Sequence, residues 1–299
     1  MKKYSVRPAT PRDIDAVYAL IAAQNINDFG DALLTMDDLQ RRWQNLHFET
    51  DTCMAYEDGE LAGYAELRDG TAPFIYLTAL HNVDLGFQLL TILEEIAADR
   101  KVAELSTQIS AKNQTLLELF LLNGYHSSLS FLIMELVMDE APPAPQWADG
   151  ITVRSFILGH DEEATFRADD EASQDKGYHQ PLDFNGWLRR MGMELERFDP
   201  SLWFLACDSN EVVGVALNVY DSQSNTGWVD HLGVRRAWRK KGIGKALLLH
   251  SFGEFYQRGI RRIKLSVDAK SLTNAPHLYE SVGMKTIQQY HIYKKELQM

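Results

Sequence analysis

Alternation of apolar and polar residues divides the second half of the chain into a regular series of strands and helices. Strands are predicted where apolar residues occupy every second position or form short runs, at 151–156, 202–207, 212–220, 227–234, 263–267, 285–288 and 290–295. Helices are predicted where apolar residues recur every three or four positions, at 160–173, 183–198, 242–258 and 274–282. This order favours an α/β fold of the mixed, α+β kind, a mixed sheet with helices on both faces.

The first half of the chain repeats the second in the same order. Four segments of each half match, pairing 5–8 with 152–155, 58–63 with 210–214, 85–90 with 243–248, and 119–125 with 278–284. A repeat of this length indicates two copies of one domain. A proline-rich stretch, Ala-Pro-Pro-Ala-Pro, marks a linker because proline stops both helix and sheet. We therefore expect domains at 1–140 and 151–299 joined by a linker at 141–150.

Composition places the chain among globular proteins. It has 299 residues, 45% of them hydrophobic, and a formal net charge of −12. This acidity argues against nucleic acid as a partner and is compatible with a cationic amine. The start of the chain lacks the apolar run of a secretory signal, and no run reaches the roughly 18 apolar residues that span a bilayer. We expect a cytoplasmic protein with no membrane partner, in which Cys53 and Cys207 are buried free thiols.

The loop that joins the strand 227–234 to the following helix has the composition of a phosphate-binding loop. It reads Arg239-x-x-Gly242-x-Gly244. Glycines let the backbone approach a ligand closely, and the amides that open the next helix carry the positive end of its dipole. Lysines at 240, 241 and 245 add charge of the matching sign.

Further motifs follow this loop in a fixed order. A strand, 263–267, leads to Asn274, the pair Leu278-Tyr279, and Gly283 followed by a hydrophobic residue. With the loop, these motifs resemble the signatures of the GNAT superfamily of acyl-CoA-dependent N-acetyltransferases, most strongly over 228–284. The repeat then implies two tandem GNAT-like domains, an architecture with precedent in the superfamily.

The resemblance implies that acetyl-CoA is the co-substrate and assigns residues to bind it. The backbone of the strand end would pair with the pantetheine arm and polarise the acyl carbonyl. Asn274 would hydrogen-bond the same arm, or cap the helix that it precedes. The residues expected to bind acetyl-CoA are Leu232, Gly233, Val234, Arg239, Lys240, Lys241, Gly242, Ile243, Gly244, Lys245 and Asn274.

Two residues are candidates for proton transfer. The resemblance assigns Tyr279 as the acid that protonates the leaving thiolate. An amine with a pKa of about 10.4 is neutral in about one molecule in a few thousand at pH 7, so a base is also useful. Strand alternation places Asp230 on the apolar face with Trp228 and Leu232, where burial should raise the pKa of its carboxyl group. We therefore predict Asp230 as the base, ahead of His231 and Glu171.

The first copy has lost the residues that carry this chemistry. His81, Asp84 and Phe120 stand where the second copy has Arg239, Gly242 and Tyr279. An aspartate would repel a pyrophosphate. We expect a structural or substrate-shaping domain with a weak or lost acyl-CoA site.

Three functions are consistent with these features. The leading one is direct transfer of an acetyl group from acetyl-CoA to a small-molecule amine in the second copy. The acidic residues Asp169, Asp170, Glu171 and Asp175 are candidates to hold a cationic acceptor. The alternatives are a non-catalytic acyl-CoA-binding module and a tandem transferase that uses aminoacyl-tRNA. The sequence contains no metal-binding spacing of cysteine or histidine.

Overall fold

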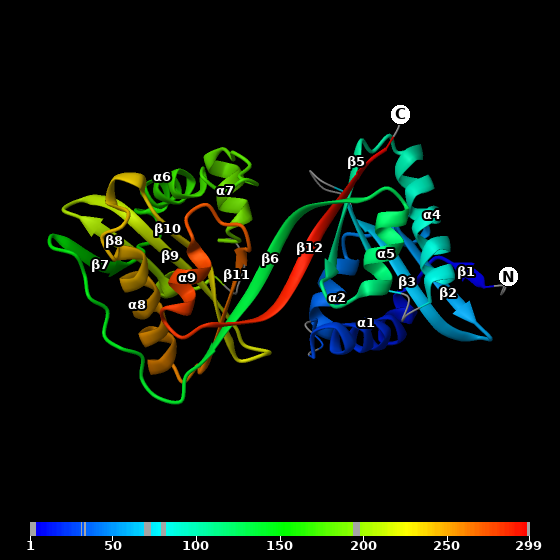
Figure 1. Ribbon diagram of the computed structural model, residues 1–299, viewed down its shortest axis with the longest axis horizontal. Helices are drawn as coiled ribbons and strands as arrows, with labels where there is room; N and C mark the ends of the chain where they lie inside the picture. Colours follow the sequence, from blue (N-terminus) through cyan, green and yellow to red (C-terminus); the bar gives the residue numbers. More distant parts are fainter. Residues whose placement is uncertain are drawn as a thin grey trace. The chain divides into compact units, whose positions relative to one another are not determined.

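The computed structural model describes residues 4–30, 32, 34–68, 73–78, 82–193 and 198–297. It divides into two compact units (Figure 1), which we call unit 1 (Met1–Phe131 with Gln288–Met299) and unit 2 (Leu132–Ile287). His81, compared above with Arg239, lies outside the described residues. Among those that are described, no helix is both long and apolar enough to pass through a bilayer.

Unit 1 is a mixed sheet with strand order β1-β2-β3-β4-β5-β12. Its strands are β1 (Ser5–Arg7), β2 (Thr52–Glu57), β3 (Glu60–Arg68), β4 (Phe74–Thr78), β5 (Glu104–Ser110) and β12 (Lys285–Glu296). Its helices are α1 (Ile14–Phe29), α2 (Met36–Trp43), α3 (Phe48–Asp51), α4 (Val83–Asp99) and α5 (Gln114–Leu122). Along β2, Cys53 and Ala55 pack in one core with α4 and α5, whereas Met54 packs in another with α1 and α2. Helices therefore cover both faces of the sheet.

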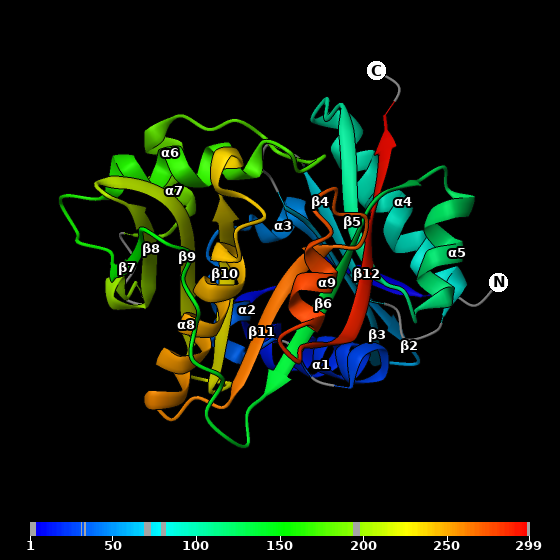
Figure 2. The same cartoon turned by 60° about the vertical axis from the view of Figure 1, so that its left-hand side comes forward.

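Unit 2 repeats this plan with strand order β6-β11-β10-β9-β8-β7. Its strands are β6 (His126–Val137), β7 (Ile151–Ser155), β8 (Trp203–Asp208), β9 (Glu211–Asp221), β10 (Thr226–Val234) and β11 (Arg262–Asp268). Its helices are α6 (Glu162–Ser173), α7 (Phe184–Arg190), α8 (Ile243–Gln257) and α9 (Ala275–Glu280). Trp203 and Leu205 of β8 pack with α6 and α7, while Phe204 and Ala206 pack with α8 on the opposite face (Figure 2). The predicted mixed α/β fold with helices on both faces is confirmed.

The two units do not follow the predicted boundaries at residues 140 and 151. The chain passes from one unit to the other twice, within β6 and within β12, so that 132–140 belong to unit 2 and 288–299 to unit 1. Tyr290 to Glu296 of β12 pair antiparallel with Ser110 to Glu104 of β5. An alternating pattern predicts a strand but not the sheet edge that it joins, because strand pairing is set by contacts distant in sequence.

Two smaller expectations can also be compared with the structure. Cys53 and Cys207 are free and buried, as predicted. The helix predicted at 183–198 is shorter: α7 ends at Arg190, and residues 194–197 of the predicted range lie outside the described part of the chain. Gly192 adopts a positive φ of 62°, a conformation that stops a helix.

Candidate active site

The centre of unit 2 is a gap between two parallel strands. The paired register of β10 and β11 runs from Thr226 with Arg262 to Trp228 with Lys264. From there to Val234, β10 remains paired with β9 on its other side. The backbone groups of the β10 end that face away from β9 are therefore available to an incoming extended ligand, as they are at any free sheet edge.

The predicted phosphate-binding loop opens helix α8 as expected. Gly242 caps the helix with a φ of 80°, and no atom lies within 4 Å of where its Cβ would be. The glycine is thus required by backbone conformation rather than by space. Lys240, Lys241 and Lys245 are exposed around this helix start, while Ile243 is buried in the core below it. The first amides of α8 and three lysine charges together form a site suited to a phosphate.

Arg239 does not share this exposed position. Its Nε donates to the carbonyl oxygen of Val234 (2.9 Å), and its guanidinium pairs with Asp175 and donates to the carbonyl oxygen of Ala172 (3.3 Å). The side chain therefore connects the end of β10 to the end of α6. The sequence led us to expect Arg239 to bind acetyl-CoA; it did not indicate the pairing with Asp175, which is distant in sequence.

Neighbouring arginines make the same connection. Arg235 donates to Glu171 (2.6 Å), the Arg236 amide donates to the other Glu171 oxygen (3.1 Å), and Arg236 pairs with Asp175 (2.7 Å). Although burial opposes it, these bonds lower the pKa of the Glu171 carboxyl group. Glu171, the third candidate for the base, is therefore held as a paired anion and is a poor proton acceptor.

Gly233 is required by the packing of α6 on β10. A Cβ built at Gly233 would lie 2.7 Å from the Cβ of Ala172. No pair of real Cβ atoms approaches so closely, so the absent side chain explains the close approach of helix and strand. This packing reason for the glycine is additional to the backbone pairing with the pantetheine arm that the sequence led us to expect.

We expect Gly233→Ala to lower the free energy of unfolding by about 1–3 kcal/mol, because an overpacked methyl group must displace α6. Urea unfolding followed by circular dichroism measures this change. Ala172→Gly should restore part of the loss when combined with Gly233→Ala. Additive effects of the two substitutions would contradict the proposed contact, since residues that touch show coupling.

A β-bulge in β10 reverses the predicted orientation of two candidate bases. Val229 pairs with Asn218 and His231 with Leu217, so Asp230 is the extra residue between them. Its side chain is 61% exposed, whereas that of His231 is 15% exposed. The prediction that Asp230 is buried on the apolar face with Trp228 is therefore wrong, because the bulge interrupts the alternation on which it rested.

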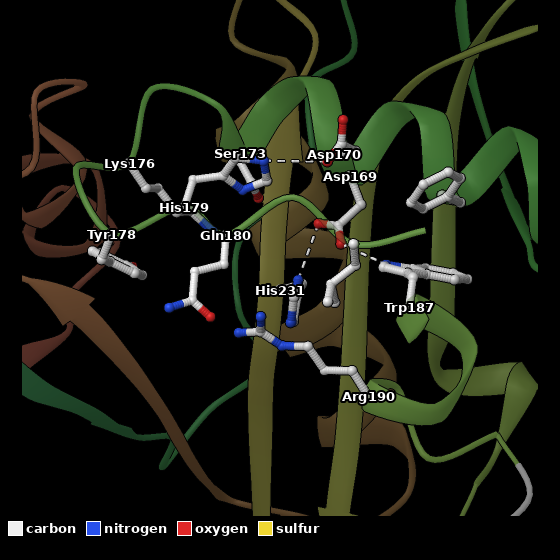
Figure 3. Close-up of a pocket in the computed structure, with 12 residues that line it drawn as sticks. Asp169, Asp170, Ser173, Lys176, Tyr178, His179, Gln180, Trp187, Arg190 and His231 are labelled. Carbon is white, nitrogen blue, oxygen red and sulfur yellow. Dashed lines mark hydrogen bonds and ion pairs between the residues drawn. The ribbon is translucent and has the colours of Figure 1, made fainter. Parts of the chain in front are cut away.

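His231 instead belongs to a buried hydrogen-bonded group. Its Nδ1 lies 3.0 Å from Asp169 Oδ1, and Trp187 Nε1 donates to Asp169 Oδ2 at 2.9 Å (Figure 3). Because a carboxylate only accepts, Nδ1 carries a proton; in the neutral ring Nε2 is then an acceptor, and it lies 4.0 Å from Asp230 Oδ2. Burial opposes the charge of Asp169, but the bond from His231 and then that from Trp187 outweigh it and lower the pKa of this carboxyl group.

A pocket opens beside this group between α6, α7 and β10. Twelve side chains line it (Figure 3), namely those of Phe166, Asp169, Asp170, Ser173, Lys176, Tyr178, His179, Gln180, Leu182, Trp187, Arg190 and His231. The sequence reading named Asp169, Asp170 and His231 but gave no role to Lys176, His179 or Arg190. These residues come from the segment after α6 and from the end of α7, and no periodic pattern brings them together.

Tyr279 lies in α9, with 8% of its surface exposed. Burial raises the pKa of its hydroxyl, and the nearby hydroxyl of Tyr178 acts in the same direction. Tyr178 lines the pocket and Tyr279 does not; Tyr279 belongs to the core cluster against which Leu232 of β10 packs. A hydroxyl with a raised pKa remains protonated at neutral pH, as a general acid must.

The asparagines that precede α5 and α9 differ in how their side chains are used. In unit 1, Asn113 accepts from the Leu116 amide (3.0 Å) and donates to buried Asp28 (2.9 Å). In unit 2, Asn274 has a φ of 58° and makes no side-chain cap bond. Its amide therefore remains available to a ligand, whereas that of Asn113 is used within the protein.

Known proteins resemble the chain over its whole length. The sequence pattern of the Acetyltransferase (GNAT) family matches residues 163–284. A mycothiol acetyltransferase from Streptomyces coelicolor is 25% identical over 96% of this chain and 93% of its own. A tandem GNAT protein from the clavulanic acid biosynthesis pathway shares the fold, with a TM-score of 0.74, 13% identity and 98% coverage of both chains.

One solved structure is similar to this chain in both sequence and fold. It is a GCN5-related N-acetyltransferase from Sphaerobacter thermophilus, 35% identical, with a TM-score of 0.84 over 98% of this chain and 95% of its own. Because this identity extends over both repeats, the similarity includes the two-domain arrangement as well as the motifs of unit 2. The chain therefore belongs to the GNAT family and is an acyl-CoA-dependent N-acetyltransferase with two tandem domains.

Proposed function

We propose that unit 2 transfers an acetyl group from acetyl-CoA directly to the amine of a small-molecule acceptor. The observation that carries this proposal is the pairing of His231 with buried Asp169 at the wall of a pocket. His231 is the proposed proton acceptor, and buried Tyr279 is the proposed proton donor. The name of the mycothiol acetyltransferase relatives supports a small molecule as acceptor.

The residues at the strand gap and the α8 loop fit acetyl-CoA. The backbone of Leu232, Gly233 and Val234 would bind the pantetheine arm and polarise the acyl carbonyl, and Asn274 would donate to the same arm. The amides from Gly242 to Lys245, including those of Ile243 and Gly244, would hold the pyrophosphate, with Lys240, Lys241 and Lys245 supplying charge. Arg239 would act indirectly, by fixing the loop to α6.

Two side chains, those of His231 and Tyr279, then transfer protons during the reaction. His231 Nε2 accepts a proton from the acceptor ammonium, directly or through water, and the freed nitrogen lone pair attacks the thioester carbonyl carbon. As the tetrahedral adduct collapses, the carbon–sulfur bond breaks and the thiolate takes the Tyr279 proton. The acetylated nitrogen loses its second proton to solvent, His231 Nε2 releases its proton to solvent, and solvent reprotonates Tyr279. The products are an amide, free CoA thiol and one proton.

Incubation of the full chain with acetyl-CoA and a panel of amines tests this proposal. Release of free thiol that depends on the amine, together with an acetylated product seen by mass spectrometry, is the expected result. Thiol release without an acetylated amine, or acetyl-CoA binding without any turnover, would favour the non-catalytic alternative.

We expect Gly244→Asp to weaken acetyl-CoA binding by at least about tenfold, through repulsion of the pyrophosphate. The fold should tolerate the change, because a Cβ at Gly244 would meet its nearest neighbours at ordinary contact distances of 3.6 and 3.7 Å. An acidic residue in the first turn of a helix is also stabilising. Calorimetric titration gives the affinity, and the melting temperature reports the fold.

The same titration measures how many acetyl-CoA molecules bind. We expect one per chain, because unit 1 has Asp84 in the first turn of α4 and uses its Asn113 amide internally. Two equivalent tight sites would contradict the assignment of unit 1 as a domain without an acyl-CoA site.

A further inference from the structure

Two cationic side chains in the pocket beside His231 form no ion pair with any carboxylate that the structure describes. Lys176 follows α6, and Arg190 is the last residue of α7; both line the pocket with His231 (Figure 3). Within the part of the chain that the structure describes, neither side chain makes a hydrogen bond or an ion pair. By contrast, Arg235, Arg236 and Arg239 all have carboxylate partners.

The carboxylates near these cations are occupied by other groups. Asp169 uses both oxygens, one on His231 and one on Trp187. Asp170 lies 3.3 Å from His179 Nε2 and accepts from Gln174 at 3.1 Å. Both acidic side chains of the pocket are thus hydrogen-bonded to other groups, and neither forms an ion pair with Lys176 or Arg190.

Lys176 and Arg190 are close enough to affect each other. Burial lowers the pKa of the Lys176 ammonium group, the charge of Arg190 lowers it further, and Asp169 and Asp230 act in the opposite direction. Partial burial of a cation beside a second cation is unfavourable unless an anion joins them. A bound anion would remove this cost and would accept hydrogen bonds from both side chains.

We propose that the acceptor is an amine that also carries an anionic group, a carboxylate or a phosphate, which Lys176 and Arg190 bind while its amine faces His231. The inference rests on the proposed function, since it assigns the substrate class of the same pocket. It replaces the cationic acceptor that the acidic residues of α6 led us to expect. Glu171 and Asp175, two of those residues, pair with arginines instead.

The test compares acceptors that differ only in the anionic group. The full chain is assayed with acetyl-CoA and the pairs γ-aminobutyrate and n-butylamine, β-alanine and n-propylamine, and phosphoethanolamine and ethanolamine. The first two pairs probe a carboxylate at two chain lengths, and the third probes a phosphate. We expect the anionic member of at least one pair to have the higher kcat/KM, mainly through a lower KM.

Variants then connect this preference to the two cations. Arg190→Gln and Lys176→Met should each lower kcat/KM for the preferred anionic acceptor by about tenfold to a hundredfold, the usual effect of losing a hydrogen bond to a charged group. The neutral member of the pair should change by less than about twofold. Arg189→Gln is the matched control, because Arg189 is exposed on the same helical turn and does not line the pocket.

The outcomes separate this inference from the proposed function. Acetylation of neutral and anionic amines with equal kcat/KM, or a preference that survives both variants, would overturn the inference and leave the acetyltransferase activity intact. If no amine is acetylated, binding decides the inference: calorimetry with N-acetyl-γ-aminobutyrate and N-butylacetamide measures the preference without turnover. Selective binding of the anion that Arg190→Gln abolishes supports the inference, and equal or absent binding of both overturns it.

Discussion

Tyr279→Phe should lower kcat by about 10²–10⁴-fold, the range that general acid catalysis contributes. The variant loses one hydroxyl from a side chain that is 8% exposed, and Phe120 is buried at the corresponding place in unit 1. Fold and acetyl-CoA affinity should therefore be unchanged. Steady-state kinetics, calorimetry and thermal unfolding measure the three quantities. Tyr293→Phe, the same change at a tyrosine 7% exposed in the core of unit 1, is the control.

The pH dependence of Tyr279 gives a second measurement. Burial raises the pKa of the folded-state hydroxyl above the ordinary value of about 10. The contribution of this tyrosine to stability is therefore complete below about pH 10 and is lost as the pH rises toward the folded-state pKa. Above pH 10 the wild type should lose more stability than Tyr279→Phe.

A Tyr279→Phe variant that loses acetyl-CoA affinity in proportion to kcat would show that Tyr279 binds or packs and is not the acid.

His231→Gln should lower kcat/KM by about 10²–10⁴-fold near pH 7, and the loss should shrink as pH rises. Glutamine keeps a polar side chain that can reach Asp169 but cannot take a proton from the acceptor. At higher pH more of the amine is already neutral, so the variant gains rate until the pH reaches the pKa of the amine. A pH–rate profile of the variant with the best acceptor measures this rescue.

Asp230→Asn is the matched control for His231. Its side chain is 61% exposed and lies 4.0 Å from His231 Nε2, so its loss should change kcat/KM by less than about threefold. A large, pH-dependent loss in Asp230→Asn with a small one in His231→Gln would reverse the assignment and restore Asp230 as the base. A loss in His231→Gln that is uniform across pH and accompanied by a lower melting temperature would give His231 a structural role.

Local features of the sequence predicted the helices and strands around the proposed acetyl-CoA site. Hydrophobic periodicity predicted α8, and the glycine motif predicted its left-handed start at Gly242, because helix formation and positive φ depend on nearby residues. The internal repeat predicted two similar units. The motifs around Tyr279 predicted its helix and its place, since α9 follows β11 after a short loop.

The tertiary structure decided which side chains meet. A single bulge in β10 exposed Asp230 and turned His231 toward Asp169, although the two residues are adjacent in sequence. The assignment of residues 288–299 to unit 1 depends on contacts between residues 190 positions apart, such as the bond from Lys294 to Glu104. Local sequence patterns indicate the secondary-structure propensity of a segment and which of its faces is buried. Bulges, strand partners and charge pairs are instead fixed by contacts between residues distant in sequence. For that reason the sequence indicated acetyl transfer, and only the fold brought Lys176 and Arg190 to the pocket beside His231.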